Sequence, residues 1–141
     1  QERNMIQVQL AQIQPLLNSP IMTIPGVSIK LAAAIIGEIG DISRFTNYRS
    51  LIAYAGLDNS VYQSGQSLTY GRISKRGSLY LRTVLYKASI AIIQHTKSFY
   101  DTYYKKRQEG KHHTLALTIV SRKLLRVVYS LLKNDQSFYD C

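Results

Sequence analysis

The sequence predicts a mostly α-helical, compact domain with one long Gly/Ser-rich loop in its middle. Apolar side chains recur at helical spacing on both sides of residues 56–78, where the helical pattern stops. The length of 141 residues and a 45% hydrophobic composition suit one folded core. Within the loop, Val61–Tyr62 and Leu68–Tyr70 are candidates for short strands of a small β-hairpin.

The first predicted helix covers residues 2–17. Ile6, Leu10, Ile13 and Leu17 form a narrow stripe at the spacing of a coiled coil, and glutamines occupy the other positions. The Asn18-Ser19-Pro20 sequence ends the helix, because proline cannot continue the backbone hydrogen bonds. Residues 1–19 are therefore predicted to be the end of a coiled-coil helix, and residues 20–141 the domain proper.

Two helices are predicted before the loop. Ser28 caps the first, which runs over residues 29–39 and ends at Gly40. Its inward-facing side chains are Leu31, Ala32, Ile35, Ile36 and Ile39. A short second helix follows Thr46 as its cap and ends at Gly56.

Three helices are predicted after the loop. The first spans about residues 78–96, and Ser74 and Ser78 are its candidate caps. Its apolar face is formed by Leu79, Leu81, Leu85, Ala88, Ile92 and Ile93. Ser98 is the predicted cap of the second, which Gly110 ends. The third spans about residues 112–133, with its apolar face at Leu115, Ile119, Leu124, Val127, Val128 and Leu131.

The positive charge is concentrated in the second half of the chain. The formal net charge is +10, and residues 1–60 contain four basic and four acidic residues. Residues 61–133 contain fourteen basic and two acidic residues, a formal charge of +12. Such a block indicates a surface for a polyanion, because neutralising phosphates releases their counterions. A general solubility role or contact with acidic lipid is the alternative.

Other classes are disfavoured by composition. The cysteine content is a single residue, Cys141, so a disulfide framework or a multi-cysteine metal site is not expected. Adjacent histidines at 112 and 113 point in different directions on a helix, which favours capping or surface roles over metal binding. No apolar run approaches the ~20 residues that a membrane-spanning helix needs. These observations predict a cytoplasmic protein that has no membrane partner.

Ser64 is the candidate nucleophile of the loop. It is followed by Gly65, which permits unusual backbone angles and close approach of a substrate. The Ser-Gly pair is also a common turn sequence, so the residues alone leave a plain turn open. Ser67 is the nearest rival hydroxyl, and its spacing does not exclude it.

Two basic clusters are candidate nucleic-acid contacts. Arg72, Lys75, Arg76 and Arg82 follow the loop and enter the next helix, where guanidinium groups could grip phosphate and stabilise a phosphoryl transition state. Lys105, Lys106 and Arg107 follow Tyr100, Tyr103 and Tyr104, a basic and aromatic sequence that suits a nucleic-acid backbone. A solvated charged surface is the alternative for both clusters.

The turn Pro25-Gly26-Val27-Ser28 resembles the hairpin of a helix-hairpin-helix DNA-binding element. In that element, small residues let backbone N–H groups approach a phosphate at a helix N-terminus. Ser28 stands where the motif usually has a second glycine, and the alternative is a plain turn between packed helices.

Several collinear blocks resemble a known family. They are IPGVSIKLAAAIIGEIGDISRF, YRSLIAYAGLDNSVYQSG, GRISKRGSLYLRTVLYKAS, Gly110-Lys111 and RKLLRVVYSLL. In this order, over about residues 20–139, they resemble the C-terminal transposase domain of the IS-one-ten family of insertion-sequence transposases, relatives of the Piv DNA invertase.

The resemblance implies a mechanism and partners. Full-length members carry a RuvC-like nuclease domain with metal-binding acids, then a coiled coil, then this domain. The family serine matches Ser64, which would attack a DNA phosphodiester and form a covalent phosphoserine intermediate. The resemblance implies no cofactor in this chain and Mg²⁺ in the RuvC-like domain. Some members use a bridge guide RNA and act as homo-oligomers.

Two rival hypotheses remain. A non-enzymatic helical nucleic-acid-binding module would explain the charge and the hairpin, but it leaves the long Gly/Ser loop unexplained. A protein-interaction fragment built on the helix at residues 2–17 is the weaker rival. Trapping a covalent protein–DNA adduct separates catalysis from binding alone.

Overall fold

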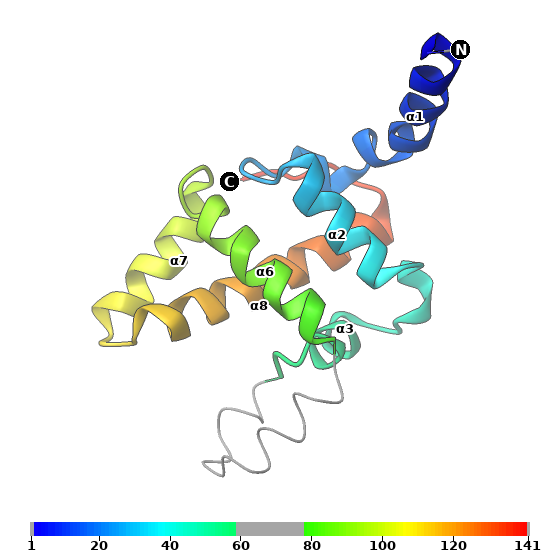
Figure 1. Cartoon of the computed structure of the whole chain (residues 1–141). Helices are drawn as coiled ribbons and strands as arrows, with labels where there is room; N and C mark the ends of the chain where they lie inside the picture. Colours follow the sequence, from blue (N-terminus) through cyan, green and yellow to red (C-terminus); the bar gives the residue numbers. More distant parts are fainter. Residues whose placement is uncertain (1, 59–77, 141) are drawn as a thin grey trace.

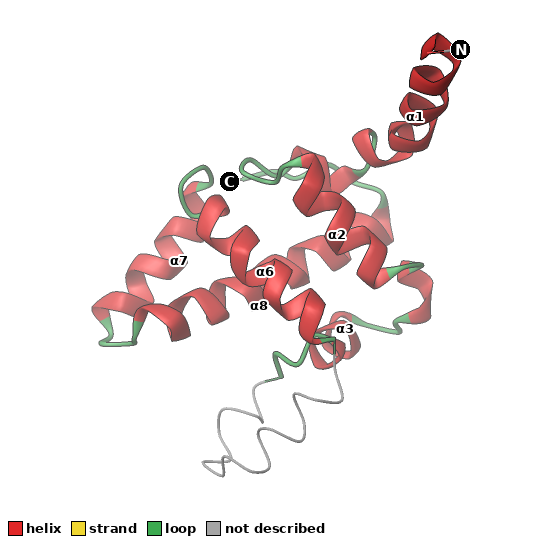
Figure 2. Ribbon diagram, in the orientation of Figure 1, coloured by secondary structure: helices red, strands yellow, loops and turns green. Residues whose placement is uncertain are grey.

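The computed structural model describes residues 2–58 and 78–140, and the side chains of residues 10–14 are not described. Its helices, in chain order, are α1 (Glu2–Leu17), the short 3-10 helix η1 (Pro20–Thr23), α2 (Ile29–Ile39), the 3-10 helix η2 (Ile42–Arg44), α3 (Tyr48–Tyr54), α6 (Leu79–Ile92), α7 (Lys97–Gln108) and α8 (His113–Asn134). The described part contains no strand (Figure 2), so the predicted mostly helical fold is confirmed. The predicted β-hairpin lies outside the described residues.

Helix α8 is the central element of the fold. It packs against α6, α7 and α3, and α2 covers α6 (Figure 1). The core includes the fully buried side chains of Ile35, Leu85, Phe99 and Leu124, which come from these different helices. Burying one side chain of this size contributes about 1.5–3 kcal/mol, so the contacts between helices hold the domain together.

Helix α1 projects away from this core (Figure 1). Its apolar side chains at Met5, Ile6 and Val8 are more than half exposed, while Leu16 packs against the core at the other end. The helix thus has apolar surface that the described part of the chain leaves uncovered. The coiled-coil assignment of residues 1–19 stays a prediction.

Several predicted helix ends are confirmed. Ser28 Oγ accepts a hydrogen bond from the Leu31 amide at 3.2 Å and caps α2. Gly40 and Gly110 have φ angles of +69° and +87°, the left-handed conformation in which glycine commonly ends helices. His112 caps α8, because its Nδ1 accepts a hydrogen bond from the Thr114 amide at 3.1 Å.

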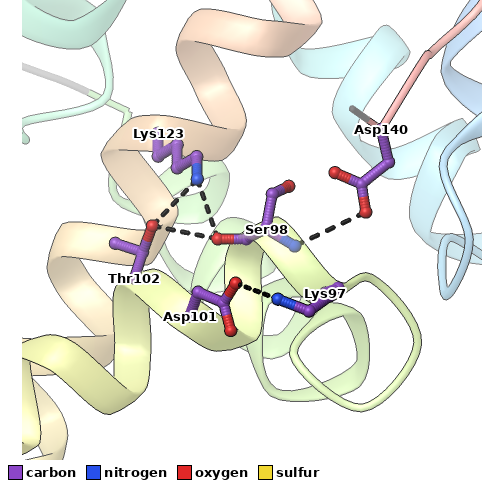
Figure 3. A network of polar contacts seen from close by, with 6 residues as sticks. All are labelled: Lys97, Ser98, Asp101, Thr102, Lys123 and Asp140. Carbon is purple, nitrogen blue, oxygen red and sulfur yellow. Dashed lines mark hydrogen bonds and ion pairs between the residues drawn. The ribbon is translucent and has the colours of Figure 1, made fainter.

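Two predicted caps are wrong. Asn47, and not Thr46, caps α3, with its Oδ1 2.9 Å from the Ser50 amide. Helix α7 begins after Thr96, so Ser98 lies inside its first turn. The Ser98 amide is one of the unpaired donors of that turn, and it faces Asp140 Oδ2 at 3.4 Å (Figure 3).

The apolar faces are partly different from the predicted ones. Leu79 was expected to face inward, but it is 61% exposed because it opens α6 where the helix leaves the core. In α8, Leu115, Ile119 and Val127 are only half-buried. The side chains that α8 buries are Ala116, Leu117, Val120, Ser121, Leu124, Leu125, Val128 and Leu131. A central helix is covered on more than one side, so a single stripe does not describe it.

Candidate functional site

A cationic groove lies between α3 and α8. Its volume is about 490 Å³, and it is lined by Tyr48, Arg49, Ile52, Asp58, Ile119, Arg122, Lys123 and Arg126. Four of these residues are basic and one is acidic. The groove therefore concentrates positive charge in a concave surface, an arrangement that attracts anions.

The helical repeat explains why these side chains meet. Ile119, Arg122, Lys123 and Arg126 are spaced at three, four and seven residues, which places them on one face of α8. The Asn47 cap fixes the start of α3, so Tyr48, Arg49 and Ile52 lie in its first turns opposite that face. Packing of α3 on α8 then closes the two sides of the groove.

Tyr48 organises two of the arginines. The guanidinium carbon of Arg126 lies 4.7 Å from the centre of the Tyr48 ring, and that of Arg49 lies 5.9 Å from it. A hydrogen bond with the Arg49 side chain and the positive charges of Arg126 and Arg49 lower the pKa of the Tyr48 hydroxyl. The ring thus holds two cations near each other that would otherwise repel.

Lys123 has a structural role within the groove wall. Its ammonium donates hydrogen bonds to the Ser98 carbonyl at 2.9 Å and to Thr102 Oγ1 at 2.8 Å, both on α7 (Figure 3). It also lies 5.1 Å from the centre of the buried Phe99 ring. Burial lowers the pKa of Lys123, against the raising effect of Asp140 and Asp101. Lys123 therefore joins α8 to α7.

Arg122 is the most enclosed arginine of the groove. Its side chain is half-buried, and its Nε atom is buried without a hydrogen-bond acceptor in the described part of the chain. A buried donor without an acceptor costs about 1–3 kcal/mol. A rotation of the guanidinium that turned this N–H toward an acceptor in the groove would remove this cost.

The residue that precedes the predicted catalytic segment lies in the lining of the groove. Ser64, Gly65, Arg72, Lys75 and Arg76 lie outside the described residues. Asp58, the last residue described before them, lines the groove.

Residue 78 is the first described after that segment, and it is anchored at the end of α3. The Ser78 amide donates a hydrogen bond to the Tyr54 carbonyl, and its hydroxyl bonds to Glu38. The hydroxyl also caps α6, accepting a hydrogen bond from the Leu81 amide at 3.0 Å, as the sequence predicts. Both ends of residues 59–77 are therefore held at the α3 end of the core.

The other predicted cations lie elsewhere. Arg82 is half-buried in the first turns of α6, and its Nη1 has no hydrogen-bond acceptor in the described ranges. Lys105, Lys106 and Arg107 form the last turn of α7. There Lys106 pairs with Glu109 at 3.1 Å, and Arg107 donates to the Lys111 carbonyl at 2.9 Å. Neither set lines the groove between α3 and α8.

The predicted hairpin is a turn packed against the junction of α6 and α7. Gly26 has a φ angle of +99°, and a Cβ atom there would lie 3.0 Å from the Ile92 Cα atom. Thr96 Oγ1 donates a hydrogen bond to the Pro25 carbonyl at 2.9 Å, and Val27 is buried. Close packing against Ile92 explains the glycine at position 26. Phosphate contact by Pro25–Ser28 stays a prediction.

The groove arginines are the candidate residues that sequence reasoning missed. Arg122 and Arg126 lie three and seven residues after Ile119, so the sequence already indicates that these side chains share one helix face. Arg49 lies more than seventy positions earlier in the chain, and its spacing to α8 carries no such signal. Tertiary packing alone brings the three together.

Fold and groove together define an all-helical domain, over residues 2–58 and 78–140, with a concave surface suited to a polyanion. Comparison with known families makes this specific. Residues 18–105 match the model described as the transposase IS116/IS110/IS902 family, and the chain belongs to that family. The resemblance to the IS-one-ten family is thus confirmed at the level of the family.

Individual relatives agree with this assignment. The chain is 30% identical over 135 residues to the insertion element IS110 uncharacterized 43.6 kDa protein of Streptomyces coelicolor, covering 92% of this chain and 33% of the relative. It is 29% identical over 121 residues to the transposase for insertion sequence element IS1111A of Coxiella burnetii, covering 84% and 33%. It is 30% identical over 135 residues to the pilin gene-inverting protein of Moraxella bovis, covering 92% and 42%. The chain thus spans about a third of the length of the first two relatives.

Within residues 2–58 and 78–140, no group of three or more His, Cys, Asp and Glu side chains could hold a metal ion. Helices long and apolar enough to cross a membrane are also not found among these residues.

Proposed function

We propose that this chain is the C-terminal catalytic domain of a serine-type DNA transposase or recombinase, related to the Piv invertase, with Ser64 as its nucleophile. Membership of the transposase family and the similarity to a pilin gene-inverting protein support action on DNA. The observation that carries the proposal is the cationic groove between α3 and α8, whose lining includes Asp58, the last described residue before the segment that contains Ser64.

The chemistry is a phosphoryl transfer. Ser64 Oγ forms a bond to a DNA phosphorus, the bond from that phosphorus to a deoxyribose oxygen breaks, and this oxygen leaves with a proton. The proton of the serine hydroxyl passes to a general base. A serine ester retains the energy of the phosphodiester, so the strand can be resealed without a nucleotide cofactor.

A hydroxyl at neutral pH needs help from its surroundings. Cations beside the reacting phosphate stabilise the charge of the transition state, a role we assign to Arg72, Lys75 and Arg76. We assign the base and Mg²⁺ to a RuvC-like domain, which the resemblance to the family implies for full-length members. This chain alone is then expected to bind nucleic acid without recombining it.

Assembly is part of the proposal. The exposed apolar side chains of α1 at Met5, Ile6 and Val8 suit association with another helix, which supports a homo-oligomer. A bridge guide RNA is the second proposed partner, and the basic block at residues 61–133 provides charge for either nucleic acid.

A covalent adduct tests the assignment of Ser64. A protein that carries this domain together with the RuvC-like domain is incubated with DNA ends of its insertion sequence, and the adduct is mapped by mass spectrometry. Ser64→Ala should abolish the adduct and leave DNA affinity nearly unchanged, since it removes one hydroxyl. Ser67→Ala is the matched control and should retain the adduct. An adduct on Ser67 or on any other residue would overturn the assignment.

The second candidate is a non-enzymatic helical nucleic-acid-binding module. The groove between α3 and α8 favours it specifically, because Arg49, Arg122 and Arg126 could bind phosphate without any use of Ser64. Failure to trap an adduct on any residue, with DNA affinity intact, would favour this candidate.

A further inference from the structure

We propose that Arg49, Arg122 and Arg126 hold one phosphate group of a nucleic-acid backbone in the groove between α3 and α8. That the phosphate belongs to nucleic acid rests on the proposed function, while the anion site itself rests on the geometry. The inference adds a binding site on α3 and α8 to a reaction centre that the proposal above places in residues 59–77.

The three arginines approach the groove from two helices. Arg49 comes from α3, and Arg122 and Arg126 come from successive turns of α8. Each guanidinium has a planar array of N–H donors that matches two oxygens of a phosphate. Donors that converge from two sides can fix the position of a phosphate, which a single helix face cannot do.

Preorganisation distinguishes this cluster from a solvated charged surface. Arg126 and Arg49 both contact the Tyr48 ring, at 4.7 Å and 5.9 Å, so part of their conformational freedom is already lost. Fixing long side chains before the ligand arrives lowers the entropy lost on binding. Tyr48 is therefore a positioning residue that acts through the two arginines.

Arg122 adds an observation that points to a ligand. Its side chain lines the groove, while its Nε is buried and lacks an acceptor in the described part of the chain. A small rotation of the guanidinium that turned this N–H toward the groove would let a phosphate oxygen accept its hydrogen bond. Lys123 is less available, because two of the three N–H donors of its ammonium are bonded to Ser98 and Thr102 of α7.

The charge balance of the lining favours an anion. Three arginines and Lys123 face one carboxylate, that of Asp58, so the lining keeps a formal excess of three positive charges. Asp58 offsets one of these four positive charges. A phosphate with one formal negative charge, such as a backbone phosphodiester, fits this excess.

Location links the site to the nucleic acid. Asp58, the residue that precedes 59–77, lines the groove, and Ser78, the residue that follows them, is bonded to Tyr54 at the end of α3. On the proposed function, the chain enters the segment that contains Ser64 directly from the groove, and a DNA strand has further phosphates on either side of the reacting one. The site would thus position the strand, and Ser64 would react with it.

DNA binding by single variants of the chain gives the direct test. Fluorescence anisotropy with a labelled DNA duplex measures affinity over a range of salt concentrations. Arg49→Ala, Arg126→Ala and Arg122→Lys should each weaken binding roughly 3- to 10-fold, and the two alanine variants should each reduce the salt slope by about one. Lys30→Ala, which removes an exposed charge from α2 outside the basic block, is the matched control and should change affinity less than about 2-fold.

Variants of Tyr48 test whether this residue positions the arginines or only stabilises the fold. Tyr48→Phe retains the ring beneath Arg126, so its affinity should stay within about 2-fold of the original chain. Tyr48→Leu should weaken binding about 2- to 5-fold. Circular dichroism and urea unfolding of all variants identify any that no longer fold. Equal affinity of the Phe and Leu variants would overturn the positioning role.

Inorganic phosphate gives a readout that does not depend on nucleic acid. The Arg122 Nε–H signal in a ¹⁵N NMR spectrum should shift saturably as phosphate is added, and Arg126→Ala should weaken that response. No shift of this signal, or unchanged DNA affinity in all three arginine variants, would overturn the site. A covalent adduct on Ser64 with unchanged binding by these variants would reject the groove alone, whereas impaired binding without any adduct would reject the nucleophile alone.

Discussion

Thr96 donates a hydrogen bond from its Oγ1 atom to the carbonyl of Pro25 at 2.9 Å, across 71 positions of the chain. This bond fastens the turn before α2 to the junction of α6 and α7. Gly26, the next residue, sits directly against the backbone of that junction. The turn therefore tolerates little change, and its sensitivity can be measured.

Gly26→Ala should destabilise the domain by about 2–4 kcal/mol. The residue has a φ of +99°, and the new Cβ would lie 3.0 Å from Ile92 Cα and 3.2 Å from the Ala91 carbonyl oxygen. Gly37→Ala in α2 is the matched control, because no atom lies within 4 Å of its Cβ position. That change should stabilise by about 0.5–1 kcal/mol. Urea unfolding measures both, and similar values for the two variants would contradict the packing described.

Ser89 and Ser121 allow a close crossing of α6 and α8. Their hydroxyl oxygens are 3.0 Å apart, and each bonds to a carbonyl of its own helix, Leu85 at 2.8 Å and Leu117 at 2.9 Å. Ser89→Ala should cost only about 0.5–1 kcal/mol, because Ser121 keeps its bond to Leu117.

A larger side chain at the same position tests how tightly the two helices cross. Ser89→Val should cost about 1–3 kcal/mol, because it overfills a fully buried position. Thermal unfolding measures both Ser89 variants. A valine variant as stable as the alanine variant would show that the crossing has room to spare.

The last turn of α7 is predicted to contact nucleic acid without sequence preference. Replacing Lys105, Lys106 and Arg107 with alanine should weaken DNA or RNA binding across sequences and reduce the salt slope by about one to three. The lower end is expected, because Lys106 already pairs with Glu109 and Arg107 with the Lys111 carbonyl. Unchanged affinity and slope would place this turn outside the binding surface.

Asp41 should contribute a small stabilisation that depends on pH. Hydrogen bonds from the backbone amide of Ser43, at 2.9 Å, and from its side chain lower the pKa of the Asp41 carboxyl below 3.8. Because the folded pKa is lowered, the stabilisation is present above 3.8 and is lost as pH falls through the folded pKa. Carbon NMR titration of the carboxyl measures this pKa directly. A midpoint at or above 3.8 would contradict the bond as the source of the stabilisation.

Local features of the fold could be predicted from the sequence. The caps at Ser28, Ser78 and His112 follow from side chains that accept backbone hydrogen bonds. Thr46 and Ser98 failed as caps because the actual caps, Asn47 and Thr96, lie one and two positions away, and so small a shift is enough to change the cap. Leu79 was predicted to face the core from its helical spacing, but it is the first residue of α6 and is exposed. Spacing alone does not show where neighbouring elements stop covering a helix.

The groove between α3 and α8 could not be predicted from the sequence, for a different reason. Its two walls come from α3 and α8, and periodicity describes one helix without its neighbours. The sequence identifies a basic block in residues 61–133 but does not show that Arg49, outside the block, joins Arg122 and Arg126. Nor does it reveal that Lys123, in the same stretch, bonds to α7 instead.

The bond between the Ser78 amide and the Tyr54 carbonyl has a consequence for substitutions in this domain. It ties the start of α6 to the end of α3 through a contact between two described residues, so this junction does not depend on the side chains of residues 59–77. Chemistry and architecture are therefore separable in this domain: exchanging the side chain of Ser64, Arg72, Lys75 or Arg76 should alter the reaction and leave the helical scaffold in place.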